Sequence, residues 1–387
     1  MKTPTLLLHA LRDRFRLSVP VTNVATKYGF AFLVHPRDRR DVSKKYPFMR
    51  YLPSWCIDLF TRHLWPVVLS EVTGLRSLKT GEPVCGWVIT IPLTAEQMTH
   101  DRELALARIR EAGLLAQNMG AKIIGLGGLT SSFSKGGLDL TEHLKVGVTT
   151  GHAYTAHTVT SYMFAVEREF ALDKAKIVVA IVGASGSIGS TCAKLLARAG
   201  YRHFILIDLE RKHVHFPELM QEMIALEPKA VITTSSLVSA IRTADFIVAA
   251  TNAPEEIITS KDLKPGAIIF DDAQPSDVAA EVLDNDAVLA LEAGVISTPS
   301  VHSHFNFGLK AKTDNFCCMG EVLILAAEGW REHYVINRAS LDAVDRIVEL
   351  NRQLGFTIST FQNRKEIIPQ TKRDRVKLLA QQNQRGL

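Results

Sequence analysis

The sequence predicts an α/β protein built from two lobes, one of which holds a doubly wound parallel sheet. The middle third of the chain alternates short β-branched runs with helical patterns, as parallel sheets with crossover helices do. A glycine-rich loop joins the first of these runs to a helical stretch. At 387 residues and 47% hydrophobic, the chain is long enough for two domains with separate cores.

Six strands are expected within about 115 residues, which suits one Rossmann-type domain. They are expected at 176–182, 203–207, 230–234, 245–249, 267–270 and 287–291. Helices are expected between them, notably at 187–199 and 237–243.

The region before the Rossmann strands is predicted to form a second α/β lobe, and the region after them is predicted to form helices that return to this lobe. Before the Rossmann strands we expect a strand at 84–91, a helix at 94–118, a glycine-rich turn at 123–132 and a helix at 154–171; after them, helices at about 314–328 and 339–354. The expected domains are an N-terminal α/β substrate and catalytic domain (1–155), a Rossmann domain (156–310), C-terminal helices (311–362) and a basic tail (363–387). The C-terminal helices would return to a cleft between the lobes, where chemistry is usually found.

The positive charge of the chain is concentrated in two segments. The formal net charge is +5, and the tail from residue 363 has seven Lys and Arg against one Asp and one Glu, an equal excess. A second basic run covers 35–50. Such runs are solvated faces, weak polyanion sites or docking surfaces for an acidic partner. No nucleic-acid-binding motif is present.

Cysteine usage and hydropathy favour a cytoplasmic, reduced protein. The five cysteines are odd in number and lack framework spacing, which argues against a disulfide scaffold. No apolar run reaches the roughly 18 residues of a membrane span, although peripheral membrane contact stays open. The thirteen histidines form no His-Glu-x-x-His motif, and no metal site is expected.

The glycine-rich loop predicts a nicotinamide dinucleotide site. Gly183, Gly186 and Gly189 form a Gly-x-x-Gly-x-x-Gly pattern between a strand and a helix, with Ser185, Ser187 and Ile188 between them. The glycines let the backbone approach a pyrophosphate, and the helix N-terminus supplies N–H donors. Thr251, after the fourth strand, is expected to contact the same cofactor. The alternative is a Rossmann fold that binds nothing.

The end of the next strand bears on which cofactor binds. Asp208 would hold the ribose hydroxyls and repel a 2′-phosphate, which favours NADH over NADPH. Arg211 and Lys212 follow and could receive that phosphate, so NADPH stays open. No tyrosine has a lysine four positions later, which argues against a short-chain dehydrogenase.

Two adjacent cysteines open an apolar helix near the C-terminus. With Asp314 or Asn315 as N-cap, Cys317 and Cys318 would lie in the first turn, where backbone N–H groups and the helix dipole favour a thiolate. Glu321 shares a face with Cys318, and its carboxyl needs a cleft or a partner because the helix is otherwise apolar. Both thiols could still be core residues.

Several motifs in this order resemble those of the long-chain acyl-(acyl-carrier-protein) reductases, which make fatty aldehydes. The segment FCCMGEVLILAAEGW resembles their Phe-x-Cys-x-x-Glu…Glu-Gly-Trp stretch. LGGLTS at 126–131, TTG at 149–151 with TA at 155–156, and GASGSIGS at 183–190 resemble three further motifs of that family. The resemblance runs from about residue 30 to residue 356.

This resemblance implies a covalent mechanism. Cys318 would carry the acyl group as a thioester for reduction by NADPH or NADH, with Glu321 and His152 as the other catalytic residues. The acyl donor would be an acyl carrier protein or acyl-CoA. The implied substrate contacts are Gly128, Thr130, Thr149, Thr150 and Gly151.

The chain also departs from the pattern of that family. Cys317 stands where a small residue is expected, and Asp208 is unexpected for an NADPH enzyme. His152 and His157 replace Asn and Tyr, either as acid/base groups or through divergence.

Two other functions remain open from sequence. A two-lobed dehydrogenase like shikimate dehydrogenase would reduce a small carbonyl compound without a covalent step. A dinucleotide-sensing regulator would have kept the fold and lost catalysis.

Overall fold

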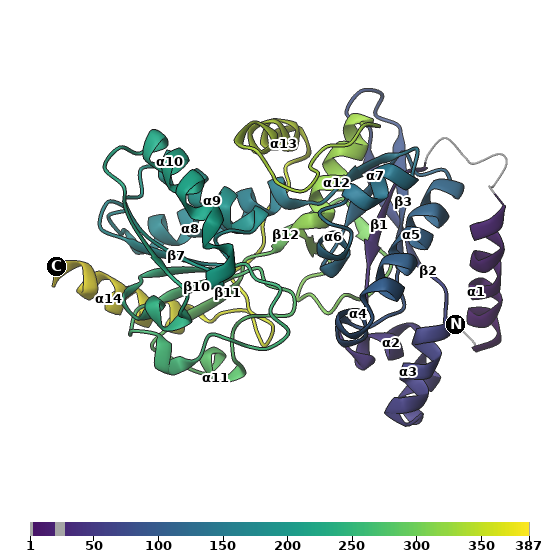
Figure 1. Cartoon of the computed structure of the whole chain (residues 1–387), viewed down its shortest axis with the longest axis horizontal. Coiled ribbons are helices and arrows are strands. Elements are labelled where there is room, and N and C mark those ends of the chain that lie inside the picture. The colour runs from purple at the N-terminus through teal and green to yellow at the C-terminus, as the bar shows by residue number, and fades with distance from the viewer. Residues whose placement is uncertain (1–2, 20–27, 387) are drawn as a thin grey trace. The chain divides into compact units, whose positions relative to one another are not determined.

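The structure is a computed structural model that describes residues 3–19 and 28–386 (Figure 1). By their contacts the residues form two compact units, each made of several segments of the chain. Unit 1 comprises Met1–Gly151, Thr298–Asn337 and Arg346–Phe356; unit 2 comprises His152–Ser297, Arg338–Asp345 and Thr357–Leu387. The C-terminal region therefore does not form a body of its own, in contrast to the expected 311–362 segment, because its residues divide between both units.

Unit 2 holds the predicted doubly wound sheet. Its six strands are β6 (Val178–Val182), β7 (His203–Ile207), β8 (Val231–Ser235), β9 (Phe246–Ala249), β10 (Ile268–Asp271) and β11 (Leu289–Glu292). They lie in the order β11-β10-β9-β6-β7-β8, and every neighbouring pair is parallel. All six predicted strands are confirmed, and the reversal of strand order beside β6 places the glycine loop at the topological switch point.

Helices cover this sheet between and beyond its strands. They are α8 (His152–Phe170), α9 (Ser187–Arg198), η2 (Glu210–His215), α10 (Phe216–Leu226), η3 (Val238–Thr243), η4 (Ser260–Asp262), α11 (Ala280–Leu283) and α14 (Gln370–Arg385). The helix expected at 237–243 is the 3₁₀ segment η3, too short for more than two tight turns. Short strands β12 (Val295–Ser297) and β15 (Thr357–Ile358) pair antiparallel outside the main sheet.

Unit 1 has a mixed six-stranded sheet in the order β13-β2-β3-β1-β4-β5. Its strands are β1 (Tyr28–Val34), β2 (Val67–Arg76), β3 (Pro83–Thr90), β4 (Ile123–Leu126), β5 (Gly147–Thr149) and β13 (His302–Ser303). The strands β3, β1, β4 and β5 are parallel to one another. The strand β2 pairs antiparallel with β3, and β13 pairs antiparallel with β2. Parallel strands put the ends of β4 and β5, with their two glycine motifs, at one edge of the sheet.

The helices of unit 1 differ from the prediction most clearly between α4 and α5. They are α1 (Thr3–Ser18), α2 (Arg39–Lys45), η1 (Pro47–Tyr51), α3 (Ser54–His63), α4 (Ala95–His100), α5 (Arg102–Asn118), α6 (Leu129–Phe133), α7 (Leu138–His143) and α12 (Cys317–Glu328). The short strand β14 (Asp314–Phe316) directly precedes α12. The helix α13 (Leu341–Leu354) begins in unit 2 and ends in unit 1. The single helix expected at 94–118 is interrupted, because Asp101 leaves helical geometry and its side chain accepts from Leu104 N–H as the N-cap of α5.

The central strands of unit 1 are buried on both faces. Ala31 and Leu33 of β1 pack in the core with α5, whereas the alternating Phe32 faces the side of α12. Figure 1 shows α5 and α12 on the two sides of β1. On the α12 side, a Cβ added to Gly125 of β4 would lie 2.8 Å from Val322 Cβ. The missing side chain at Gly125 therefore lets α12 approach the sheet.

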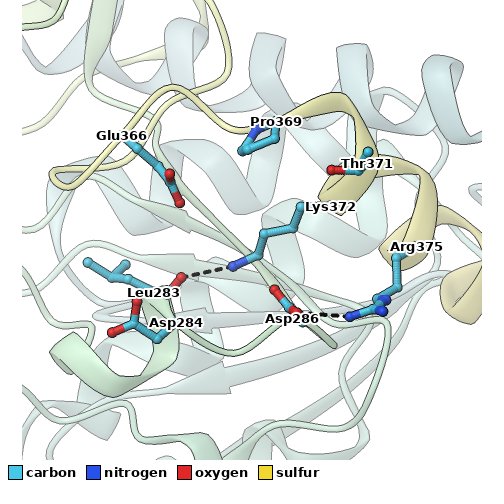
Figure 2. Close-up of a pocket in the computed structure, with 8 residues that line it drawn as sticks. All are labelled: Leu283, Asp284, Asp286, Glu366, Pro369, Thr371, Lys372 and Arg375. Carbon is cyan, nitrogen blue, oxygen red and sulfur yellow. Dashed lines mark hydrogen bonds and ion pairs between the residues drawn. The ribbon is translucent and has the colours of Figure 1, made fainter.

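The expected basic tail is largely the helix α14, which is folded into unit 2. Arg364, Lys365, Arg373 and Arg375 form ion pairs with Glu256, Asp284, Glu169 and Asp286. Figure 2 shows the first turns of α14 beside a hollow of about 310 Å³, where Lys372 Nζ donates to Leu283 O at 2.8 Å. Four of the seven cations of the tail are thus ion-paired within the chain.

None of the helices in the described ranges combines the length and apolarity needed to cross a bilayer.

We expect Gly125→Ala to destabilise unit 1 by about 1–3 kcal/mol, because the added methyl group would force α12 away from β4. Urea denaturation followed by fluorescence measures this change. Gly386→Ala is the control, since its Cβ would meet only ordinary contact at 3.7 Å. Equal stability of the two variants would contradict the close approach of α12.

Candidate functional site

The predicted cysteine helix begins at Cys317, three residues later than expected. Asp314 and Asn315 belong to β14, so neither caps the helix; the N-cap is Phe316, which has no side chain able to accept a hydrogen bond. Cys317 and Cys318 are the first two residues of α12 and lie in its first turn, as predicted. The first-turn N–H groups have no cap from a side chain, which makes this end of α12 attractive to an anion or a polarised oxygen.

The two thiols are in different environments. Cys317 is 3% exposed and is part of the packing of unit 1, whereas Cys318 is half-buried. Only Cys318 is therefore open to a reagent or substrate from solvent.

Glu321, one turn after Cys318, has partners in the core of unit 1. Its side chain is fully buried. Oε1 accepts a short hydrogen bond from Thr149 Oγ1 and one of 3.1 Å from Gly151 N–H. A buried carboxyl group is tolerated only with such donors. The expected partner of Glu321 is thus the motif at the end of β5, 170 residues earlier in the chain.

Gly151 lies directly against Cys318. Its φ of +81° is in the left-handed region, and a Cβ there would lie 2.6 Å from both Cα and Cβ of Cys318. Only glycine permits this approach, and Glu321 holds its N–H. The two motifs that carry the family resemblance in this unit therefore meet at one thiol.

A segment after α12, which sequence reasoning passed over, completes this site. Thr150 N donates to Val335 O at 3.0 Å, and Tyr334 N donates to Val148 O at 3.1 Å. Burial, and then the nearby charge of Glu321, raise the pKa of the Tyr334 phenol. The Thr150 hydroxyl is buried without a hydrogen-bond partner in the described part of the chain, which leaves a donor beside Gly151.

The Leu-Gly-Gly-Leu-Thr-Ser loop is supported by a histidine. His35 Nε2 accepts from Leu129 N–H at 3.2 Å while Nδ1 donates to Pro36 O at 2.9 Å, which sets the neutral tautomer. Burial lowers the pKa of His35 in agreement with this assignment. A Cβ on Gly128 would lie 2.8 Å from His35 Nε2.

Thr130, a predicted substrate contact, is fully buried and donates its hydroxyl to Gly127 O at 2.9 Å. Its side chain therefore holds the turn after β4.

In unit 2, the glycine loop has the geometry of a dinucleotide site. A Cβ on Gly183, whose φ is +87°, would lie 2.4 Å from Ala250 O, and one on Gly189 would lie 2.4 Å from Gly183 O. Gly186 is the N-cap of α9, so Ser187 and Ile188 are its first two residues and present first-turn N–H groups. A tight loop that ends in an uncapped helix N-terminus fits a pyrophosphate.

Asp208 faces the loop itself. Its Oδ2 accepts from Ser185 N at 3.1 Å and Ser185 Oγ at 2.5 Å, and Lys212 Nζ lies 3.4 Å from Oδ1. Asp208 is 8% exposed, whereas Arg211 is exposed. In the structure the carboxylate predicted to hold a ribose shapes the glycine loop.

The C-terminal part of unit 2 adds a cation that the sequence did not reveal. Arg338 Nη2 donates to Ser185 O at 3.1 Å, and Ala339 N donates to Ser187 Oγ at 3.0 Å. Arg338 is exposed and has no ion-pair partner among residues 3–19 and 28–386. No local motif marks it, because it is 153 residues from the loop it contacts.

Two buried carboxyls organise the loops after β9 and β10. Asp277 accepts from Thr251 N at 3.2 Å and from Thr251 Oγ1 at 2.5 Å, so it fixes the predicted cofactor residue. Asp271 accepts from Ser276 Oγ and Ala273 N. Burial raises the pKa of Asp271 to about 7 and the pKa of Asp277 to about 6.

The two histidines of α8 differ in their suitability for proton transfer. His152, its first residue, is half-buried and follows Gly151 in the chain. Burial lowers the pKa of His157 to about 4, against the attraction of Asp345. His157 is therefore neutral near pH 7 and poorly suited as a general acid. Across the described residues, no three His, Cys, Asp or Glu side chains gather in a metal-binding arrangement.

Comparison with known proteins gives partial matches. The family model for shikimate/quinate 5-dehydrogenase matches residues 165–292, about a third of the chain. The aminotransferase PigE of Serratia sp. is 29% identical over 290 residues, 72% of this chain and 33% of PigE. This chain thus spans about a third of the length of PigE. The long-chain acyl-[acyl-carrier-protein] reductase of Synechococcus elongatus is 25% identical over 335 residues, 82% of this chain and 94% of that protein.

Solved structures show only a distant likeness. Quinate dehydrogenase from Corynebacterium glutamicum has a TM-score of 0.34 at 12% identity, with coverage of 84% of this chain and 100% of that one. Shikimate 5-dehydrogenase from Listeria monocytogenes has a TM-score of 0.35 at 12% identity, with coverage of 85% and 98%. The TM-scores carry no conclusion about function. The family match and the glycine loop support an NAD(P)-dependent oxidoreductase.

We expect Glu321→Ala to lower the free energy of unfolding by about 2–4 kcal/mol, because two buried donors lose their acceptor. Alkylation of Cys318 by iodoacetamide should also change in rate, since Gly151 would no longer be held against it. Urea denaturation and peptide mass spectrometry measure the two effects.

The matched control for this variant is Glu328→Ala, at the other end of α12. Glu328 pairs with the exposed Lys79 at 3.1 Å, and its removal should cost less than about 1 kcal/mol. Similar losses in both variants would rule out a special role for the Glu321 contacts.

The raised pKa values of Asp271 and Asp277 predict a pH-dependent stability. Both exceed the unfolded value of about 3.9, so the folded chain binds more protons, and the stability contribution present below about pH 4 is lost as pH rises to about 7. We expect Asp271→Asn to gain about 1–3 kcal/mol relative to the natural chain between pH 5 and pH 8. Urea denaturation at the two pH values measures this gain, and a pH-independent difference would refute it.

Proposed function

We propose that this protein is an NAD(P)H-dependent reductase that converts a fatty acyl thioester to a fatty aldehyde through an acyl group held on Cys318. The observation that carries the proposal is the half-buried Cys318 in the first turn of α12, packed against Gly151 and backed by the buried Glu321. The distant similarity to the acyl-[acyl-carrier-protein] reductase over 82% of the chain supports it.

Capture of the acyl group needs a thiolate and donors for the carbonyl oxygen. The Cys318 thiolate attacks the thioester carbonyl carbon, and the carrier thiolate leaves and takes up a proton. The first-turn N–H groups of α12 and the buried hydroxyl of Thr150 are candidate donors for the oxygen that becomes negative. In this proposal Glu321 is a positioning residue, because it acts through Gly151.

Reduction then releases the aldehyde. The bound nicotinamide cofactor supplies the hydride that turns the Cys318 thioester into a hemithioacetal. As the C–S bond breaks and the Cys318 thiolate departs, the hemithioacetal hydroxyl returns its proton to His152, and the aldehyde forms. Overall, one thioester, one reduced cofactor and one proton give one aldehyde, one carrier thiol and one oxidised cofactor. His152, half-buried beside Gly151 in the chain, is the proposed proton donor to the hemithioacetal oxygen.

The cofactor would be held at the glycine loop of unit 2. First-turn N–H groups of α9 would bind the pyrophosphate, and Arg338 adds a guanidinium at Ser185. We favour NADH, because Asp208 is a carboxylate at the end of β7. The exposed Arg211 and the half-buried Lys212 are the residues that would serve NADPH.

The acyl donor in this proposal is a thioester of acyl carrier protein or of coenzyme A. Of the two basic segments considered as docking surfaces, the tail is mostly ion-paired with unit 2.

A second candidate function is reduction of a small carbonyl compound without a covalent step. The match of residues 165–292 to the shikimate/quinate 5-dehydrogenase family model favours it. It assigns no role to Cys318, which makes the two functions separable.

Acylation without cofactor distinguishes these functions. The protein is incubated with palmitoyl-carrier protein or palmitoyl-CoA and analysed by intact mass. We expect a palmitoyl adduct on the Cys317–Cys318 peptide of the natural chain and of Cys317→Ala, and none on this peptide in Cys318→Ala, because Cys317 is buried and Cys318 is open to the donor. Peptide mapping separates this adduct from one on Cys56, which is also half-buried.

An adduct that survives in Cys318→Ala would reject this sulfur as the nucleophile. Absence of an adduct at every chain length, with turnover of a small hydroxy acid, would favour the second function. Binding of NAD(P)H with neither adduct nor turnover would indicate a dinucleotide sensor.

A further inference from the structure

Four helices at the edge of unit 1 pack together as a cap, which we define as residues 3–19 and 39–65 (α1, α2, η1 and α3). Their shared apolar core consists of Leu6, Ala10, Val42, Tyr46, Met49, Ile57, Leu64 and Val67. The indole N–H of Trp65 donates to Ala10 O at 2.6 Å and joins α1 to the end of α3. The inner faces of these helices are therefore buried against one another.

The outer faces of the cap are unusually apolar. Seventeen large hydrophobic side chains are exposed in the described part of the chain, and eight of them belong to this cap. They are Leu8, Leu11, Phe15 and Val19 in and after α1, and Tyr51, Leu52, Trp55 and Leu59 around α3. About half of the exposed large hydrophobic side chains thus lie in about a ninth of the chain, which indicates an interaction surface.

Helix geometry shows that these exposed residues form stripes. In α1, Leu8, Leu11 and Phe15 follow a spacing of three and four residues and lie on one face, opposite the buried Ala10. In α3, Trp55 and Leu59 are four residues apart and 66% and 53% exposed. Neither stripe is needed for the packing of unit 1.

The cap is also strongly basic. It contains nine Lys and Arg against three Asp, an excess of six, whereas the whole chain has a net charge of +5. Several of these cations are paired inside unit 1, as Arg39 is with Asp58 and Arg62 with Asp101.

Three arginines of the cap, Arg14, Arg40 and Arg50, make no ion pair with any described residue. The guanidinium carbons of Arg14 and Arg50 lie 6.0 Å and 5.9 Å from the ring centres of Trp65 and Tyr51. The cap therefore combines apolar stripes, exposed aromatic rings and guanidinium groups that have no ion pair with a described residue.

We propose that the outer face of this cap docks on an anionic lipid bilayer. The leucine, phenylalanine and tryptophan side chains enter the boundary between headgroups and acyl chains, and the unpaired arginines contact lipid phosphates. An acidic protein would be recognised chiefly by unpaired cations, and it would leave most of the eight apolar side chains in water. The combination of charge and apolar surface therefore selects lipid.

This docking surface is independent of the proposed reaction. If the chain does make a fatty aldehyde, docking would let that water-insoluble product pass into the bilayer, and this consequence alone rests on the proposed function.

Vesicle binding by the full-length protein tests the surface. The probes are phosphatidylcholine vesicles and vesicles that also contain about one third phosphatidylglycerol. We expect sedimentation with the anionic vesicles, a weaker association at high salt, and a blue shift of tryptophan emission that is lost in Trp55→Phe. Affinity should fall about tenfold in Phe15→Ser/Leu59→Ser and in Arg40→Gln/Arg50→Gln.

The matched control is Val214→Ser/Leu237→Ser, which removes two side chains of unit 2 that are 75% and 66% exposed. It should bind vesicles as the natural chain does. The arginine variant and Trp55→Phe change exposed side chains only, so the test stands even where the double serine variant folds poorly.

Absence of binding to anionic vesicles would overturn the proposal, as would equal losses in the cap and control variants. It would also be overturned if the cap variants abolished binding to an acyl carrier protein, or self-association, while no variant changed vesicle binding. Palmitoylation of Cys318 without vesicles is measured in parallel and reports on the proposed function alone.

Discussion

The buried carboxyl group of Glu321 is the constraint on which the candidate site depends. A carboxyl at full burial in an apolar helix is costly unless donors meet it. The donors are the hydroxyl of Thr149 and the N–H of Gly151. The start of α12 must therefore lie against the end of β5, and Gly151 can approach Cys318 only because it has no side chain. The buried carboxyl of Glu321 thus holds the backbone of Gly151 against Cys318.

In unit 2, buried carboxyl groups likewise accept hydrogen bonds that hold loops in place. Asp208 binds Ser185 in the glycine loop, and Asp277 binds both donors of Thr251 after β9. Carboxyl oxygens accept several N–H and O–H donors at once, so they fix loops at the carboxyl ends of parallel strands, where ligands bind in this fold. Two of the residues predicted from sequence to touch a cofactor, Ser185 and Thr251, are therefore held in place by acidic side chains, of which the sequence did not mark Asp277.

The sequence predicted well those features that depend on local pattern. All six strands of unit 2 were found, because the buried parallel strands such as β9 and β10 read as apolar runs and the more exposed β8 is rich in β-branched residues. The glycine loop and the position of Cys318 in a first helical turn were likewise local. Prediction failed where a single polar side chain competed with a helical pattern, as at Asp101. It also did not identify the partners of the tail, four of whose cations pair with carboxylates at least 80 residues away.

By itself the sequence determined the strands, the glycine loop, the amphipathic stripes and the chemistry available at each position, since these follow from periodicity and residue type. Tertiary structure alone decided that Glu321 meets Gly151, that Arg338 reaches the glycine loop, and that Cys317 is buried while Cys318 is not. Each of these is a contact or an exposure set by residues more than a hundred positions apart or by neighbouring elements. Such contacts form when apolar faces pack and buried polar groups find partners, and no local window of sequence records which partner that is.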